Sequence, residues 1–101
     1  MADVTAAARR VRYEVHILGV ATAERFYFEE AIPVGSAMPR TGELAGPMQS
    51  KASWRRVTAV EPAPVRWNVG LIVHLEPIDC SYLERDFEVE IGALRDAGWK
   101  P

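Results

Sequence analysis

The two histidines of this sequence, His16 and His74, could bind a metal, and the nearest further ligand candidates are Asp79 and Cys80. Both histidines fall on the polar side of predicted strands, and neighbouring strands can bring such side chains within coordinating distance. Zinc sites, however, carry their ligands at short characteristic spacings, and none of these spacings occurs here. We therefore expect two solvent-facing histidines, no metal and no cofactor.

Cys80 and His74 are also the residue types of a thiol nucleophile and its base. A reactive cysteine needs an electropositive and partly exposed setting, because the thiolate is the reactive form. Acidic residues surround Cys80 in the sequence and would raise the pKa of its thiol. The paired acids Glu29 and Glu30 have the pattern of a solvated face. We identify no catalytic residues and predict that the protein is not an enzyme.

Tryptophan and arginine gather at two points of the sequence, Trp54-Arg55-Arg56 and Arg66-Trp67. Both residue types are enriched in interaction hot spots, and both can stack on nucleic-acid bases. The alternative is that the tryptophans close a small barrel core and the arginine stems cover them.

Residues 33–53 are rich in Gly, Pro, Ser and Ala and show neither helical nor strand periodicity. This pattern predicts a long loop, and such loops in compact domains are usually either functional or disordered. Met38, Leu44 and Met48, with Arg40 between them, can form an adaptable apolar arm for a partner. Equally, they can fold back onto the domain.

Alternating apolar and polar residues predict the strands that carry these segments. Residues 10–17 alternate strictly, and residues 25–32 form a second run that makes a hairpin with the first. Residues 54–61 and 69–76 read as two further strands, the last of them central because it is the most apolar. We place Phe26 and Phe28 on the core side of the second strand.

The segment 81–97 fits two descriptions. Ser81 and Glu84 have the spacing of a capping box, and apolar residues follow on one helical stripe: Leu83, Phe87, Ile91 and Leu94. Gly98 is a plausible end to that helix. Residues 86–91, however, also alternate between acidic and apolar types, as in an edge strand. We favour the helix because Ala93, Leu94 and Ala97 extend the apolar pattern beyond the alternating run.

The chain length of 101 residues fits one domain. We predict a mainly β (α+β) fold over residues 10–101, with residues 1–9 as a flexible N-terminal tail. The strands form a small antiparallel β-meander or partly open barrel of four to five strands with one C-terminal helix.

Charge and cysteine content narrow the functional classes. The net charge of −2 provides no general positive field for nucleic acid or membrane surfaces. A single cysteine cannot form an internal disulfide, which favours the cytoplasm. Frequent arginine and alanine suggest a bacterial or phage source. We expect a monomer or small homo-oligomer.

Three functions remain open. The leading hypothesis is a non-enzymatic protein-interaction module, adaptor or regulatory, that presents the 33–53 loop and the Trp54–Arg56 edge to another protein. The first alternative is a single-stranded nucleic-acid-binding barrel whose arginines share one face: Arg9, Arg10, Arg12, Arg55, Arg56 and Arg66. The second is a small-ligand binding protein or small enzyme with a pocket in the barrel mouth, lined by Tyr13, Phe28, Trp54 and Trp67.

Overall fold

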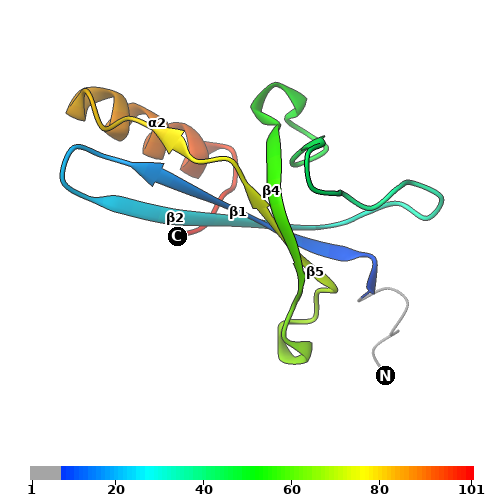
Figure 1. Ribbon diagram of the computed structural model, residues 1–101. Helices are drawn as coiled ribbons and strands as arrows, with labels where there is room; N and C mark the ends of the chain where they lie inside the picture. Colours follow the sequence, from blue (N-terminus) through cyan, green and yellow to red (C-terminus); the bar gives the residue numbers. More distant parts are fainter. Residues whose placement is uncertain (1–7) are drawn as a thin grey trace.

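β1 (Arg10–Leu18) is the strand around which the fold is built, because it pairs with three other strands. The computed structural model describes residues 8–101, apart from the side chain of Ala52. Within that range one six-stranded sheet curls into a partly open barrel with an α-helix against its inner face (Figure 1). The other strands are β2 (Ala23–Ala31), β3 (Leu44–Ala45), β4 (Arg55–Pro62), β5 (Leu71–Leu75) and β6 (Ile78–Asp79).

The alternation along β1 decides which face of the sheet is buried. The apolar side chains of one face are at most 2% exposed and form the centre of the core: Val11, Tyr13, Val15 and Ile17. Strand side chains alternate between two faces, so Arg12, Glu14 and His16 lie on the opposite, outer face. The predicted strand and its core face are confirmed.

β2 returns beside β1 as an antiparallel hairpin. The Gly19 N–H donates to the carbonyl oxygen of Thr22 at 2.7 Å within the turn. Phe26 is fully buried and Phe28 packs against the core, whereas Tyr27 lies on the outer face between them. The predicted hairpin and its inward-facing phenylalanines are confirmed.

β4 and β5 form a second antiparallel hairpin, and β4 carries a bulge. Val57 lies opposite Leu75, whereas the next pair joins Ala59 to His74. Thr58 is therefore an extra residue, and its hydroxyl donates to the carbonyl oxygen of His74 at 3.2 Å. Because bulges increase local twist, this one contributes to the curl of the sheet.

The strand order departs from a simple meander. The order is β2-β1-β5-β4-β3, and β5 pairs in parallel with β1, with Val11 opposite Leu71. Parallel pairing requires a long crossover connection. Residues 33–53 provide it by carrying the chain from β2 to the far edge, where β3 pairs with β4. The partly open barrel is confirmed, but its strands do not follow one another in sequence order.

α2 (Glu84–Asp96) packs against β1 and covers one end of the curled sheet (Figure 1). Three residues of its apolar stripe are buried: Phe87, Ile91 and Leu94. The predicted helix is confirmed, and the alternative of an edge strand over residues 86–91 is wrong. The apolar stripe at helical spacing prevails because it meets the inner face of β1, whereas Val89 is 63% exposed.

The first turn of α2 lacks the predicted capping box. Leu83 is the N-cap residue, so Glu84 is the first residue of the helix rather than the third, and no side chain caps it. The Ser81 hydroxyl and N–H instead donate to Asp79 Oδ1, at 2.6 and 3.0 Å. These two bonds lower the pKa of Asp79. The Ser81 hydroxyl therefore forms part of a local turn with Asp79 and does not cap the helix.

Gly98 ends α2, as its sequence position predicts. Its φ is +95°, and the N–H groups of Gly98 and Trp99 donate to the carbonyl oxygens of Arg95 and Leu94, at 3.0 and 2.9 Å. This is a Schellman motif, in which glycine tolerates the left-handed backbone. The motif turns Trp99 into the core, where it is 4% exposed and its ring centroid lies 5.7 Å from that of Phe28.

The two ends of the described chain both contact β2 or the segment after it. The expected tail falls largely outside the described residues, since these exclude residues 1–7. Arg9 donates to the carbonyl oxygen of Ile32 at 3.3 Å. The backbone of Lys100 pairs with that of Tyr27 in an isolated antiparallel β-bridge at the edge of β2. No helix in the described part of the chain is long and apolar enough to cross a membrane.

Candidate interaction site

The 33–53 segment is fixed to the sheet by hydrogen bonds at several points. The Arg9 guanidinium donates to the carbonyl oxygens of Pro33 and Ser36. The Arg56 guanidinium donates to the carbonyl oxygen of Gly42 at 2.7 Å. The segment also contains β3 and a short 3-10 turn, η1 (Lys51–Ser53), so it is less irregular than its composition predicts.

Trp54 packs against the 33–53 segment and hydrogen-bonds to it. Its indole N–H donates to the carbonyl oxygen of Pro47 at 2.8 Å. Gly46 lies so close that a Cβ there would be 2.7 Å from Trp54 Cδ1. Trp54 therefore acts as a packing residue under the loop, which favours the alternative that the tryptophan closes the core.

An apolar pocket of about 190 Å³ lies between this segment and the inner face of the sheet. Its main lining side chains are Tyr13, Ile32, Met38, Leu44, Met48 and Trp54. We call it the loop pocket. Leu44 is 60% exposed and Met48 is 47% exposed, whereas Met38 packs against the core. The apolar arm predicted from the sequence is therefore divided: one methionine folds back, and two side chains stay at the surface.

Glu30 joins β2 to the loop pocket. Its two carboxylate oxygens accept from the Met48 N–H at 3.1 and 3.3 Å. Burial raises the pKa of Glu30, opposed by that N–H and by the Tyr13 hydroxyl. Burial, with Glu30 nearby, also raises the pKa of Tyr13, so this hydroxyl stays protonated and serves as a donor. These groups therefore position the loop against β1 and β2.

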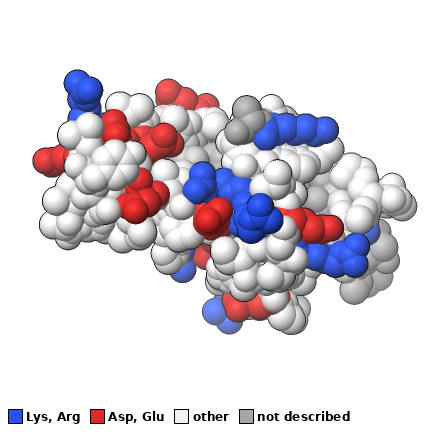
Figure 2. All heavy atoms as spheres, turned by 45° about the horizontal axis from the view of Figure 1, so that its top comes forward, with Lys and Arg blue, Asp and Glu red and all other residues white. Residues whose placement is uncertain are grey.

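The charged rim of the loop pocket is made of exposed side chains. The Arg40 N–H donates to Glu43 Oε1 at 2.9 Å, and the Arg40 Nε lies 3.9 Å from Glu43 Oε2. On the surface seen in Figure 2, acidic residues gather over α2 and the segment before it, while lysine and arginine lie mainly over the rest. The acidic surface therefore lies mainly over α2, whereas the rim of the loop pocket carries both signs of charge.

Arg55 and Arg56 form hydrogen bonds within the protein. Arg55 Nε and Nη2 donate to the carbonyl oxygens of Glu76 and Pro77, both at 2.7 Å. Together with the Arg56 bond to Gly42, these contacts tie neighbouring chain segments to β4. The Trp54–Arg56 edge thus fixes the neighbouring backbone segments by hydrogen bonds. The side chains that remain exposed at the loop pocket, Leu44 and Met48, are apolar.

Trp67 lies on the other side of the sheet. It belongs to η2 (Val65–Trp67), and the Arg12 guanidinium lies 4.1 Å from the ring centroids of both Trp67 and Tyr27. Arg12 also bonds Glu29, with Nη2 and Oε2 2.6 Å apart. Since Arg12 and Tyr13 point to opposite faces, Trp67 and Trp54 do not share a surface.

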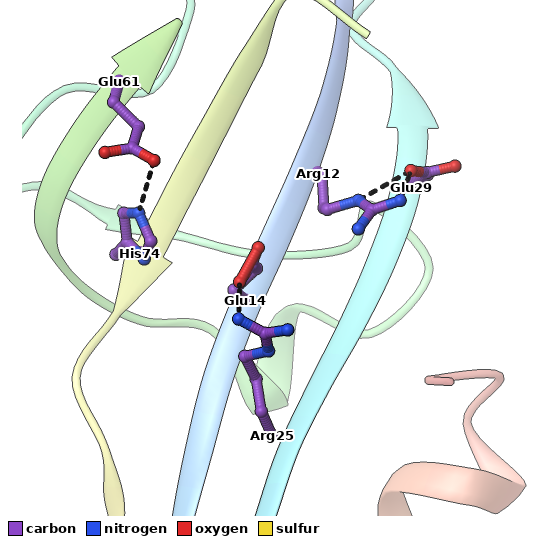
Figure 3. A network of polar contacts seen from close by, with 6 residues as sticks. All are labelled: Arg12, Glu14, Arg25, Glu29, Glu61 and His74. Carbon is purple, nitrogen blue, oxygen red and sulfur yellow. Dashed lines mark hydrogen bonds and ion pairs between the residues drawn. The ribbon is translucent and has the colours of Figure 1, made fainter. Parts of the chain in front are cut away.

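Two ion pairs and one histidine–carboxylate contact lie on this outer face, as Figure 3 shows. They are Arg12–Glu29, Arg25–Glu14 at 3.5 Å and His74–Glu61 at 3.5 Å. Their partners come from β1, β2, β4 and β5. Glu14 is 5% exposed although the strand pattern places it with the polar residues. Arg12, Glu14, Arg25 and Glu29 on the outer face are thus paired with one another. The Arg12 guanidinium also lies against the rings of Tyr27 and Trp67, so these groups are engaged within the protein.

The arrangements expected for the two alternative functions are not present. Arg9 lies by the loop, Arg12 lies on the outer face and Arg55 lines a cleft beside α2, so the six arginines do not share one face. The expected barrel-mouth pocket is also divided. Tyr13 and Trp54 line the loop pocket, Phe28 packs at a tilt against Trp99, and Trp67 lies on the outer face.

A second cavity, of about 360 Å³, lies between α2 and residues 50–55. We call it the helix cleft. Its lining includes Val15, Arg55, Leu75, Glu90, Leu94 and Trp99. The sequence alone does not predict this site. One pattern in the sequence does point to this region. Gly98 can end the helix in a Schellman motif, and the residue after such a glycine, here Trp99, is commonly apolar and packs back on the helix.

Cys80 and the histidines have the surroundings of structural residues. Burial raises the pKa of the Cys80 thiol, and Glu90, Asp86 and Asp79 raise it further, as the sequence predicts. His16 is exposed, while His74 pairs with Glu61. Across residues 8–101, no three metal-binding side chains come together.

Comparison with known proteins gives no relative. No family model, no curated protein and no solved structure matches the chain.

Proposed function

We propose that the protein is a non-enzymatic interaction module and that the loop pocket receives an apolar side chain of a partner protein. The observation that carries this proposal is the exposure of Leu44 and Met48 on a segment that is otherwise fixed by hydrogen bonds. Exposed apolar side chains are common singly. Two of them around an apolar pocket form the kind of concave surface that takes an anchor residue.

The fixed backbone of the loop favours binding. Ordering a mobile loop costs free energy on association, and a loop held in advance avoids most of that cost. The bonds from Arg9, Glu30, Trp54 and Arg56 supply that rigidity here. Burying one leucine-sized anchor would then contribute about 1.5–3 kcal/mol. In this proposal the 33–53 loop contacts the partner, and the Trp54–Arg56 edge holds the backbone of the loop in place.

Two further points support an intracellular interaction module. The single cysteine is buried as a protonated thiol, which suits a reducing cytoplasm. The arginines near the loop bond to backbone carbonyls, which leaves them less available for phosphates than a nucleic-acid-binding groove requires.

The test is affinity purification from the native host with a matched pair of variants. The first carries Leu44→Asp and Met48→Asp, and the second carries Val65→Asp. Val65 is 97% exposed at the β4–β5 connection, so it is an exposed apolar residue away from the loop pocket. Circular dichroism and thermal melting establish that both variants fold.

The proposal predicts that the wild type and Val65→Asp retain the same protein and that the double variant loses it. The purified partner should then bind the double variant at least about tenfold more weakly, as expected for the loss of one buried apolar contact. Equal retention by all three proteins, or equal loss in both variants, would refute the site.

A further inference from the structure

The helix cleft has an apolar floor and polar groups at its walls. Val15 and Leu75 of the sheet and Leu94 of α2 supply the floor. The cleft is larger than the loop pocket, at about 360 Å³ against 190 Å³. This volume lies at the lower end of the range for small-molecule sites. The cleft is therefore large enough for a compact organic ligand.

The indole N–H of Trp99 is a hydrogen-bond donor without an acceptor. Trp99 lines the cleft and is 4% exposed, and its Nε1 has no hydrogen-bond partner among the described residues. Nearly all buried N–H groups in native proteins have an acceptor, since an unpaired one costs about 1–3 kcal/mol. The Nε1 atom itself has almost no accessible surface, so an acceptor on a ligand in the cleft reaches it only after a small movement of the indole.

Arg55 adds a charged donor to the same cleft. Its Nε and Nη2 are bound to the carbonyl oxygens of Glu76 and Pro77, which holds the guanidinium in place. A guanidinium has five N–H donors, so its Nη1 amino group remains available. Ser50 and Ser53 also line the cleft, and the Ser53 hydroxyl is engaged with Ser50. The Arg55 side of the cleft thus offers free N–H donors on a positively charged group.

We infer that the helix cleft binds a small monocarboxylic acid with an apolar body. The apolar part would lie on the floor, and the carboxylate would accept from Arg55 and, once the indole has moved slightly towards the cleft, from the Trp99 N–H. Charge-assisted bonds between a guanidinium and a carboxylate are among the strongest hydrogen bonds in proteins. This inference does not depend on the loop pocket, because the two cavities have no lining residue in common.

Glu90 limits how the acid can lie. It lines the cleft from α2, and no hydrogen bond or ion pair involving its side chain is found within residues 8–101. Its negative charge repels a carboxylate on its own side, which directs the acid group towards Arg55. Removing this charge should therefore strengthen binding, the opposite of removing Arg55.

The experiment is a titration followed by NMR on protein labelled with nitrogen-15. The sequence has three tryptophans, and a Trp99→Phe sample identifies the Trp99 indole signal. The three probes share one alkyl chain and differ in head group: octanoate, octan-1-ol and octylamine, each below its micelle concentration. We expect octanoate to move the Trp99 indole proton downfield and to bind about tenfold more tightly than octan-1-ol.

Two charge variants complete the test. Arg55→Gln should weaken octanoate binding about tenfold, and Glu90→Gln should strengthen it, with octan-1-ol binding nearly unchanged in both. Glu90→Gln remains informative if Arg55→Gln fails to fold. Equal binding of the acid and the alcohol, tighter binding of the amine, or a Trp99 signal that does not move would each overturn the inference.

Discussion

At the scale of single residues, the polar side chains near the loop mainly hold the backbone in place. Arg55 and Arg56 donate to carbonyl oxygens 21 and 14 residues away in the sequence, and Trp54 donates to one seven residues away. The sequence shows that these residues are unusual, but not what they bind, because their acceptors are backbone groups that every residue carries. The same holds for Glu30, whose partner is the Met48 N–H.

Glu30 makes the stability of the protein depend on pH. Its pKa is raised in the folded state, so folding favours the protonated form. As pH falls from 7, Glu30 takes up a proton first in the folded protein, and stability rises until the unfolded chain is protonated too. The wild type should therefore gain stability relative to Glu30→Gln on going from pH 7 to pH 5.

Urea unfolding of both proteins across that range measures the difference. The glutamine is isosteric and keeps an oxygen that can accept from the Met48 N–H, so the variant isolates the charge. A difference that stays constant with pH, or that changes in the opposite direction, would show that burial does not control this carboxyl.

Cys80 should react slowly with thiol reagents. It is 3% exposed, and burial with three nearby acids raises its pKa, so both access and thiolate formation are unfavourable. We expect modification by an aromatic disulfide reagent at pH 8 to be roughly a hundredfold or more slower than in the urea-unfolded chain, since it requires local opening. Comparable rates in the two states would identify an accessible thiol instead.

At the scale of elements, periodicity predicts most of the structure. The two hairpins and α2 appear where alternation and helical spacing place them. The capping box fails because Ser81 binds Asp79, a choice between two local partners that spacing alone does not resolve. The short strand β3 has no signal of its own: Leu44 and Ala45 are extended because they pair with β4.

Two glycines of the C-terminal region should respond oppositely to alanine. Gly98 has a φ of +95°, and a Cβ there would lie 3.3 Å from Phe28 Cε2. Gly98→Ala should therefore lower the free energy of unfolding by about 1–2 kcal/mol, the cost of a left-handed backbone. Gly92 lies within α2, and a Cβ there would meet no atom of another element within 4 Å, so Gly92→Ala should raise it by about 0.5–1 kcal/mol.

Thermal or urea unfolding of the two variants, side by side, checks this prediction. The two substitutions add the same methyl group a few residues apart, so only the local backbone distinguishes them. Destabilisation by both, or by neither, would contradict the assignment of Gly98 as the residue that ends the helix.

At the scale of the whole molecule, the inner face of the sheet is covered by two different elements. α2 lies over one part and the 33–53 segment over another, with the helix cleft between α2 and residues 50–55. The sequence predicts that the helix covers one end of the sheet, but it leaves open whether the 33–53 segment folds back. It also does not predict how the two elements lie relative to each other, because that depends on the parallel pairing of β1 with β5. No local pattern encodes this pairing, since it joins segments about 60 residues apart.

The central claim is that another protein contacts the loop pocket. The most direct test places a photo-crosslinking phenylalanine analogue at Met48 in one sample and at Val65 in another, within the native host. Both positions are exposed, so neither replacement disturbs the core. We predict a discrete protein adduct from position 48 and none from position 65. The same adducts at both positions, or none at position 48, would contradict the account.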